Sequence, residues 1–417
     1  MNGIARTVAA LLSAVVFVGV NAHAQTLAST TKPNPPEKIC VNGRCEADSS
    51  PSPGGPIKWN PGHYMASYGV VYGGQSPAFM QAETNDLNNQ DAIVGYRMAI
   101  TWGALEPTQG NYDFSAIDTV LHRLKTAYNK PKQLVIMLWL YGQGALGQDD
   151  TRVIPAYIQQ GASYGASPVP GSHGWWGKNS NGQSTGMYAP ALYYAPVMNR
   201  MIALVQALGQ HLDGDPNVEA LFIQENATIP QAAASFGSVD PNFSDDAWLA
   251  QLQRLLPAAT AAFPHTSVIM ANSYFQKPAD TIALEKWMAA NRVAMGSADT
   301  IGQTGIDSNG VKLLSWGVQA YLGIGQYGGT DMRSQMTSMM DVEQPDIASS
   351  YFKGYGGPWS PSDMITALNQ TYRASHAFWT RLTGNQGPPA ALWPALAATC
   401  AANPLIHTAY PANYPQP

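Results

Sequence analysis

The sequence predicts an α/β protein built on a single (β/α)8 TIM barrel with long βα loops. Short apolar runs of strand length alternate with amphipathic segments over residues 59–417. The runs are nearly continuous in apolar residues, as expected where helices cover both faces of a parallel sheet. No glycine-rich phosphate loop follows the first run. This argues against the main alternative, a doubly wound sheet that binds nucleotides.

Eight segments have the length and composition of barrel strands: residues 63–68, 92–102, 133–140, 218–225, 266–272, 293–298, 336–343 and 375–382. Helical patterns separate them at residues 114–128, 191–212, 245–263, 279–291, 313–324 and 361–373. Ser244 or Asp245 is expected to cap one helix. Ser360 followed by Pro361 is typical of another helix start. A long loop is expected at residues 141–190, and a proline-rich tail after about residue 390.

The N-terminal region predicts export. Residues 1–24 have the pattern of a secretory signal, with Arg6 first, an apolar stretch over residues 8–20 and an Ala-x-Ala cleavage site ending at Ala24. The apolar stretch is shorter than the roughly 20 residues that a membrane span needs. Residues 25–58 are rich in Pro, Ser and Thr and predict a flexible linker. We therefore expect a secreted or periplasmic protein without a membrane contact after signal cleavage.

Composition indicates which classes of partner and cofactor the protein is not expected to bind. Hydrophobic residues make up 45% and charged residues 12%, with a formal net charge of -5 and no basic run, so a nucleic-acid partner is not expected. The eight His and three Cys show no metal-binding spacing, and we expect no metal and no cofactor. Any two of Cys40, Cys45 and Cys400 can form a disulfide, and the sequence does not choose among the pairings. It does not give the oligomeric state either.

Two carboxylic acids stand at the C-terminal ends of predicted strands. Glu225 ends the fourth strand and Glu343 ends the seventh. In a parallel barrel these strand ends form the floor of the active site. Carboxylates on opposite sides of the barrel mouth can flank one bound bond. That is the arrangement that glycoside hydrolysis requires. Asp341 and Asp299 are nearby alternatives, and the choice between Glu343 and Asp341 as nucleophile stays open.

Two segments resemble clan A glycoside hydrolases, which include endoglucanases, mannanases and β-galactosidases. One is the stretch from Asp215 through an apolar run to Gln-Glu-Asn at residues 224–226, which resembles the fourth-strand segment of the clan. The other is Trp102 to Phe114, which resembles the clan pattern Trp-x-x-x-Glu-Pro-x-x-Gly-x-Tyr-Asp-Phe after strand two. Arg97 and Trp379 also fall where the clan tends to place an arginine and an aromatic residue.

The resemblance implies retaining hydrolysis of a β-linked glycoside, with Glu225 as the general acid/base and Glu343 as the nucleophile. Two positions depart from the pattern. Gln224 stands where the clan usually has Asn, and Glu343 is followed by Gln-Pro-Asp rather than by an aromatic residue and Gly. We expect a carbohydrate substrate. Seven residues are therefore candidates for substrate binding: Arg97, Trp102, Trp139, Gln224, Asn272, Tyr321 and Trp379.

Each candidate has a structural alternative. The Trp and Tyr side chains can serve the core, and Arg97 on an apolar strand needs a carboxylate partner, whether it orients the nucleophile or forms a structural ion pair. Glu106 is expected to order the loop after strand two, and Glu285 to lie on a solvated helix face.

The function predicted overall is a secreted glycoside hydrolase acting on a poly- or oligosaccharide. The alternative is a non-catalytic carbohydrate-binding barrel. A lyase or esterase is disfavoured because no G-x-S-x-G elbow is present. The sugar, its linkage and endo or exo action are not readable from the sequence.

Overall fold

A computed structural model of the chain divides into two units, Met1–Glu37 and Lys38–Pro417. The residues that the structure describes all lie in the second unit: 39–41, 44–46, 56–67, 84–140, 142–143, 153–160, 164, 175–178, 184–224, 243–272, 278–297, 316–324, 327–342, 360–381 and 392–415. The predicted signal at residues 1–24 lies outside them, as do Glu225, Glu343 and Asp299.

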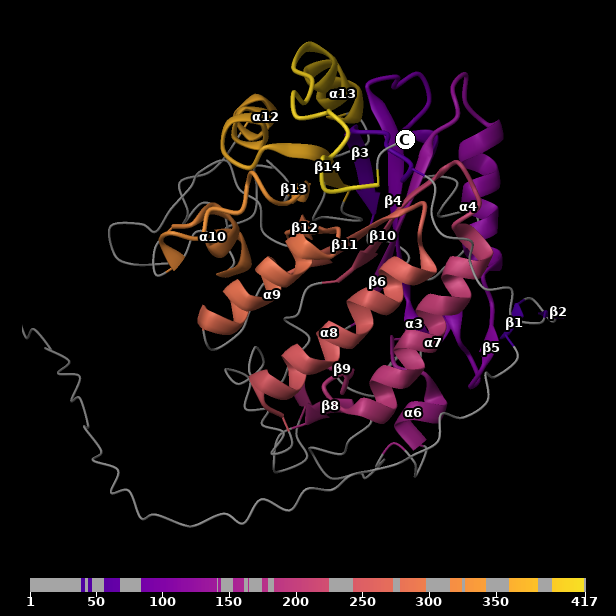
Figure 1. The fold of residues 1–417 in the computed structure, drawn as a ribbon. Coiled ribbons are helices and arrows are strands. Elements are labelled where there is room, and N and C mark those ends of the chain that lie inside the picture. Colours follow the sequence, from indigo (N-terminus) through magenta and orange to yellow (C-terminus); the bar gives the residue numbers. More distant parts are fainter. Residues whose placement is uncertain are drawn as a thin grey trace, which may run out of the picture. The chain divides into compact units, whose positions relative to one another are not determined.

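The second unit contains a closed barrel of eight parallel strands, which confirms the predicted fold class (Figure 1). Every strand pairs in parallel with both neighbours, and the last strand closes the barrel on the first. In order around the barrel the strands are β3 (Gly62–Ser67), β4 (Ile93–Thr101), β6 (Gln133–Trp139), β10 (Val218–Ile223), β11 (Ser267–Ala271), β12 (Val293–Gly296), β13 (Ser338–Val342) and β14 (Ala374–Arg381). Each falls within about a residue or two of its predicted range.

Helices alternate with these strands, as the periodicity predicts: α4 (Ser115–Thr126), α7 (Ala195–Leu212), α8 (Asp245–Ala262), α9 (Pro278–Ala290), α10 (Trp316–Leu322) and α12 (Pro361–Gln370). Their N-termini follow the expected chemistry. The Ser244 hydroxyl accepts a hydrogen bond from the Ala247 amide at 3.1 Å, and Ser360 forms a capping box with Asp363. No helix in the described part of the chain is long and apolar enough to cross a bilayer.

Three segments that the sequence left irregular contain regular structure. Within the long loop expected at 141–190, β7 (Gly142–Gln143), β9 (Ser184–Pro190) and β8 (Trp175–Lys178) form a small antiparallel sheet. Within the linker expected to be flexible, β1 (Ile39–Val41) and β2 (Arg44–Glu46) form a hairpin, with Asn-Gly between them in sequence, a dipeptide that favours hairpin turns. β1 also pairs with β5 (Asn111–Tyr112).

The third segment is the C-terminal tail. Leu392–Ala402 is a helix, α13, where an irregular tail was expected. Its buried residues Trp393, Ala397 and Cys400 recur at helical spacing, a pattern that the surrounding prolines obscured in the sequence. Cys400 is buried and is a free thiol, and burial raises its pKa to about 12. The two disulfide pairings that involve Cys400 are therefore wrong. The pairing of Cys40 with Cys45 stays a prediction, because their side chains are not among those that the structure describes.

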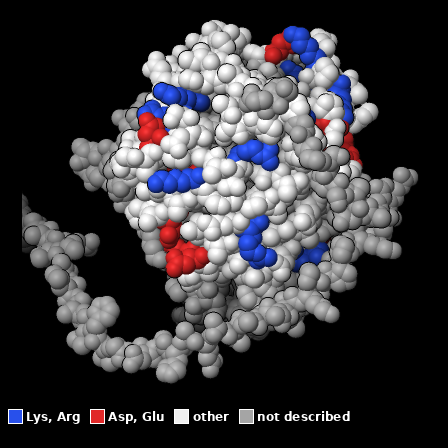
Figure 2. Space-filling model, viewed as in Figure 1, with Lys and Arg blue, Asp and Glu red and all other residues white. Residues whose placement is uncertain are grey.

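Charged residues of both signs are scattered on the face drawn in Figure 2. Among the described residues visible there, no large patch carries a single sign. This distribution matches the low charge content of the sequence.

Candidate functional site

Both candidate acids follow the C-terminal ends of parallel barrel strands in the sequence. β10 ends at Ile223 and β13 at Val342, so Glu225 follows one strand end by two residues and Glu343 follows the other directly. Both strands are parallel members of the closed barrel, and β11 and β12 lie between them on the shorter way round. Chain segments leaving β10 and β13 therefore start from the same rim at well-separated points, which is the placement that two opposed carboxylates require.

The barrel interior contains a buried ion pair. The Arg97 guanidinium on β4 donates to the Asp341 carboxylate on β13, and the side chains are 0% and 2% exposed. The Arg97 guanidinium carbon also lies 5.4 Å from the Phe222 ring centroid and 5.7 Å from that of Phe378. A buried guanidinium is costly without a charge partner. Asp341 is thus the carboxylate partner that the sequence required for Arg97.

Strand register shows which other candidates face the interior. Residues paired in register across parallel strands lie on the same face of the sheet. Arg97 on β4 pairs with Val135 on β6. Thr101, four residues after Arg97 and therefore on the same face of β4, pairs with Trp139. Trp139 thus lies on the same interior face as Arg97, at the mouth. Trp139 is 4% exposed.

Gln224 joins the ends of two barrel strands. Its side-chain Oε1 accepts a hydrogen bond from the Leu140 amide at 2.5 Å, which ties the end of β10 to the end of β6. The side chain is buried and immediately precedes Glu225. A fixed residue next to a candidate acid helps to set the direction in which the chain leaves the strand.

Trp379 and Tyr321 lie in structural contacts. The Trp379 indole Nε1 donates to His63 Nδ1 at 3.0 Å on the outer face of the barrel. Burial lowers the pKa of His63 to about 4, which leaves a neutral ring whose Nδ1 can accept this hydrogen bond. The Tyr321 hydroxyl on α10 donates to the Tyr372 carbonyl at 2.8 Å. For both residues the geometry favours core packing over the predicted sugar contact.

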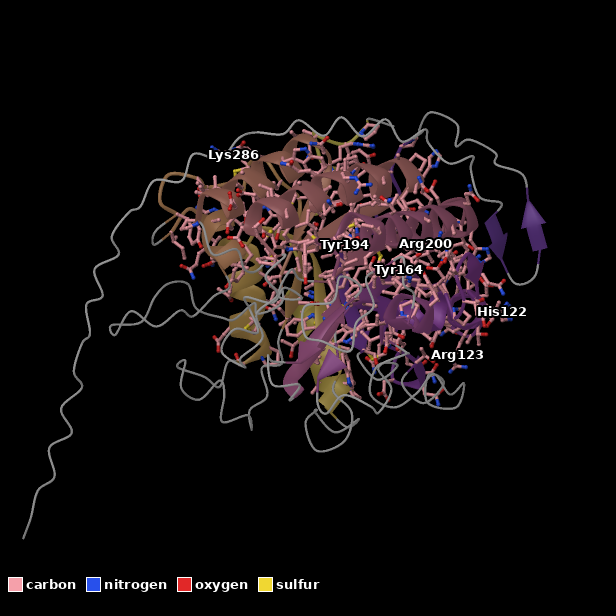
Figure 3. The ribbon with its side chains drawn as sticks, turned by 90° about the horizontal axis from the view of Figure 1, so that it is seen from below. His122, Arg123, Tyr164, Tyr194, Arg200 and Lys286 are labelled. Carbon is pink, nitrogen blue, oxygen red and sulfur yellow. The ribbon has the colours of Figure 1, made fainter. Side chains whose placement is uncertain are left out.

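Trp102 belongs to a buried network centred on Glu106. One Glu106 oxygen accepts from Trp102 Nε1 at 2.8 Å, and the other accepts from the Gly110 amide at 2.8 Å and pairs with Arg200 of α7. Gly110 has a φ of 73°, which favours glycine. Figure 3 shows Arg200 inside the packed side chains, in contrast to His122 at the margin. Glu106 therefore orders the loop after β4, as the sequence indicated.

Asn272 contacts a buried acid rather than the interior of the barrel. Its side-chain nitrogen lies 3.2 Å from Glu285 Oε1 and 3.3 Å from the Thr281 carbonyl, both on α9. Glu285 was expected on a solvated face; this is wrong, because it is 1% exposed. Burial raises its pKa well above the usual value, and the hydrogen bond from Asn272 offsets only part of this. A helix in a barrel faces strands on one side, and that side carries Glu285.

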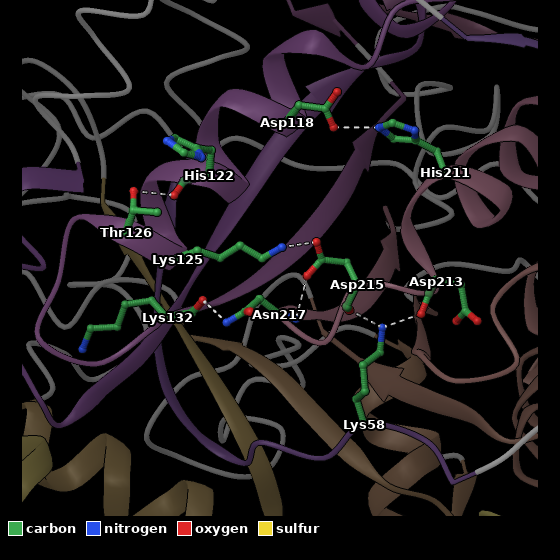
Figure 4. A network of polar contacts seen from close by, with 10 residues as sticks. All are labelled: Lys58, Asp118, His122, Lys125, Thr126, Lys132, His211, Asp213, Asp215 and Asn217. Atoms are coloured by element: carbon green, nitrogen blue, oxygen red, sulfur yellow. Dashed lines mark hydrogen bonds and ion pairs between the residues drawn. The ribbon is translucent and has the colours of Figure 1, made fainter. Parts of the chain in front are cut away.

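The segment around Asp215, which carries part of the family resemblance, precedes β10 and so lies at the N-terminal end of the barrel strands. Figure 4 shows its polar contacts. Lys58 Nζ donates to the Asp213 and Asp215 carbonyls at 2.9 and 2.8 Å. The Asp215 carboxylate pairs with Lys125 and accepts from the Asn217 amide at 2.9 Å. These contacts fix the turn that starts β10, so this part of the motif is structural.

In the described ranges no cluster of three or more His, Cys, Asp or Glu side chains is placed to hold a metal ion.

No protein-family model and no curated protein sequence matches this chain. Solved structures do match. A β-galactosidase from Bacillus circulans sp. alkalophilus superposes with a TM-score of 0.51 at 12% identity, over 84% of this chain and 56% of that one. A β-galactosidase from Rahnella sp. R3 gives 0.47 at 12% identity, over 85% and 57%. A GH5_18 enzyme from Streptomyces cattleya, solved in complex with GlcNAc, gives 0.49 at 12% identity, over 83% and 80%.

These likenesses concern the fold. The barrel has the fold of clan A glycoside hydrolases, as the two sequence segments indicated. The chain spans little more than half the length of the two β-galactosidases.

Proposed function

We propose that this chain is a glycoside hydrolase that cleaves a β-linked bond of a poly- or oligosaccharide with retention of configuration. Glu225 is the general acid/base and Glu343 the nucleophile. The observation that carries the proposal is the closed barrel in which β10 ends two residues before Glu225 and β13 ends one residue before Glu343. The fold shared with clan A glycoside hydrolases supports the same assignment.

In this mechanism the Glu343 carboxylate attacks the anomeric carbon while the glycosidic C–O bond breaks and Glu225 gives its proton to the leaving oxygen. Water then attacks the anomeric carbon of the sugar that is esterified to Glu343. Glu225 takes the proton of that water, and the sugar–Glu343 bond breaks. The first step makes a covalent intermediate and the second releases the product.

The interior residues give this mechanism its surroundings. Trp139 lies at the mouth on the interior face and is proposed as a sugar platform. Gln224 is proposed to fix the backbone that carries Glu225. Asp341 is a poor candidate nucleophile because it is 1% exposed and paired with Arg97, and this favours Glu343.

The test is hydrolysis of β-glucans, mannans, xylans and β-galactosides by the mature protein, its Glu225→Gln variant and its Glu343→Gln variant. Each substitution is expected to reduce kcat by about 10²–10⁴-fold without changing the fold. With an activated aryl glycoside, azide is expected to restore turnover of Glu343→Ala and to give a glycosyl azide of inverted configuration. Sugar binding without turnover by the unaltered protein would favour the carbohydrate-binding alternative.

We also propose export, with cleavage after Ala24 of the predicted signal. The N-terminal sequence of protein recovered outside the cytoplasm is expected to begin at Gln25. Recovery of the intact chain only from the cytoplasm would contradict this.

A further inference from the structure

We propose that a polar pocket at the N-terminal end of the barrel binds a hexuronate, a sugar that carries a carboxylate, away from the barrel mouth. Residues from 87–91 form one wall of the pocket and residues from 127–132 the other. Binding there needs no hydrolysis, so this proposal and the proposed function can fail separately.

The pocket lies at the starts of barrel strands. Its walls come directly before β4 and β6, which are neighbours in the barrel. Glu225 and Glu343 instead follow the C-terminal ends of β10 and β13 in the sequence. In a parallel barrel the starts and ends of the strands lie at opposite rims, so the pocket is separate from the mouth.

The size of the pocket limits its ligand. Its volume is about 180 Å³. Pockets for drug-sized ligands measure roughly 300–1,000 Å³. The smaller volume suits one sugar unit rather than an oligosaccharide.

Three asparagines of the pocket offer amide groups to a ligand. Asn88, Asn89 and Asn129 are exposed, and their side-chain amides form no hydrogen bond with any residue that the structure describes. Each amide carries two N–H donors and one carbonyl acceptor. A sugar hydroxyl both donates and accepts, so adjacent hydroxyls can bond to both ends of one amide. The asparagines therefore favour a ligand with several hydroxyl groups.

The charge of Lys132, which also lines the pocket, has no carboxylate partner among the described residues. Lys132 is 4% exposed, and its Nζ donates to the carbonyls of Gln90 at 2.9 Å and Ile93 at 2.5 Å. These neutral acceptors use two of the three ammonium N–H groups. Burial lowers the pKa of Lys132, against the opposing attraction of Asp91. An anionic ligand would offset the cost of burying this charge.

The second lysine of the pocket already has a carboxylate partner. Lys130 Nζ pairs with Asp91 at 2.8 Å, and both side chains are largely exposed. Lys132 therefore supplies the excess positive charge of the pocket lining. Figure 4 shows its side chain extending away from Asp215, whose carboxylate pairs with Lys125.

Together these groups favour a sugar with one carboxylate. A neutral hexose would bond to the amides but leave the Lys132 charge without an anion. Inorganic sulfate would meet that charge but leave the amide carbonyls without donors. A hexuronate supplies the carboxylate and the hydroxyls on one ring, so it matches the whole lining.

Hydrogen bonds hold the two walls together. The Tyr128 hydroxyl donates to the Thr84 carbonyl at 2.6 Å, and Lys132 reaches from the same wall to the Gln90 carbonyl. Asn89 has a φ of 60°, a conformation in which asparagine is enriched among residues other than glycine. A pocket that is formed before the ligand arrives reduces the ordering cost of binding.

The experiment is an NMR titration of the ¹⁵N-labelled mature protein with methyl β-D-glucuronide, methyl β-D-glucoside and sodium sulfate at low ionic strength. The glucuronide is expected to shift the side-chain amide signals of Asn88 and Asn129 saturably. Its dissociation constant is expected in the millimolar range and at least fivefold below those of the other two probes.

Lys132→Gln removes the charge and is expected to raise the dissociation constant of the glucuronide at least tenfold. Lys125→Gln is the matched control, since it removes a lysine charge that is paired with Asp215 outside the pocket. It is expected to change the constant less than twofold. Equal binding by Lys132→Gln and the unaltered protein would overturn the proposal.

The other probes decide the class of ligand. Glucoside that binds as tightly as the glucuronide would contradict the role of the charge, and sulfate that binds as tightly would reduce the pocket to a site for any small anion. Signals that shift only at the mouth, such as the Trp139 indole, would also contradict the proposal. If Lys132→Gln does not fold, Asn88→Ala and Asn129→Ala change exposed residues, and each is expected to weaken binding at least threefold. Unchanged binding in both would overturn the proposal.

Discussion

The two ends of the barrel use charged side chains differently. At the N-terminal end carboxylates are bonded through both oxygens to nearby backbone and side-chain donors. Asp213 accepts from the His265 amide at 3.0 Å and contacts the His265 ring at 2.6 Å. Asp215 is held by Lys125 and the Asn217 amide. Such local saturation stabilises the turns that start strands.

Farther along the strands, among the residues that the structure describes, the Arg97 guanidinium and the Asp341 carboxylate form an ion pair that crosses the barrel interior. The comparison teaches that the acids before β10 serve stability, since donors occupy both oxygens of Asp213 and of Asp215. Under the proposed function, the acids that follow β10 and β13 in the sequence serve chemistry.

The largest effect expected from this contrast is that substitution of Glu225 lowers activity and leaves stability unchanged, whereas substitution of Glu219 lowers stability and leaves kcat unchanged. Glu225→Gln is expected to lower kcat by about 10²–10⁴-fold at unchanged thermal stability. Glu219→Gln disturbs the buried hydrogen bonds of Glu219 with His376 and Asn60 and is expected to cost about 1–3 kcal/mol of unfolding free energy while the folded fraction keeps its kcat. Denaturant unfolding and initial rates measure both. Loss of stability in Glu225→Gln with normal kcat would break the comparison.

Removal of the positively charged side chain from an ion pair is expected to cost more unfolding free energy in the barrel interior than at the N-terminal end of the barrel. Arg97→Met leaves the Asp341 carboxylate buried without its charge partner and is expected to destabilise the fold by about 3–5 kcal/mol. Lys125→Met is the matched control, because its pair with Asp215 is 34% and 19% exposed. It is expected to cost about 0–1 kcal/mol. Equal costs in urea denaturation would show that burial does not separate the pairs.

Glu285 predicts a dependence of stability on pH. Its pKa is raised in the folded state by burial, so the folded protein holds this proton above pH 4.5 while the unfolded chain releases it. The contribution of Glu285 is therefore fully present below about pH 4.5 and is lost as the pH rises toward the folded pKa. The unfolding free energy of the unaltered protein minus that of Glu285→Gln should fall between pH 4.5 and 7. A flat difference would contradict a buried neutral acid.

Lys58 predicts a smaller effect of opposite sign. Burial lowers its pKa to about 8, against the opposing attraction of Asp213, Glu219 and Asp215. Between pH 8 and 10.5 the unfolded chain binds this proton and the folded protein does not, so stability from this group rises with pH. The difference between the unaltered protein and Lys58→Met should grow over that range. A difference that shrinks would place the folded pKa above the ordinary value.

The sequence predicts the barrel well because its strands are short apolar runs between clear helical patterns. It predicts side-chain direction poorly. Trp379 lies on β14 and Asn272 directly follows β11, yet Trp379 contacts His63 on the outer face and Asn272 contacts Glu285 of α9. One residue of shift in a strand exchanges interior and exterior, and apolar strands covered on both faces give no alternation from which to read the register. Arg97 is the exception, since its charge could be placed only beside a carboxylate.

Glu285 shows that the buried face of a helix is also hard to predict from the sequence. A single acid in an apolar helix is read as exposed, because burial of a carboxyl is costly. Asn272, which satisfies part of that cost, is near in space and is not marked as a partner by any sequence spacing.

The most direct test of the central claim is the anomeric configuration of the first product, followed by proton NMR during hydrolysis of a β-glycoside by the unaltered enzyme. Two acids placed to act as proton donor and nucleophile on one bond predict that the β-anomer forms first and then mutarotates. Initial formation of the α-anomer would contradict the assignment of Glu343 as nucleophile.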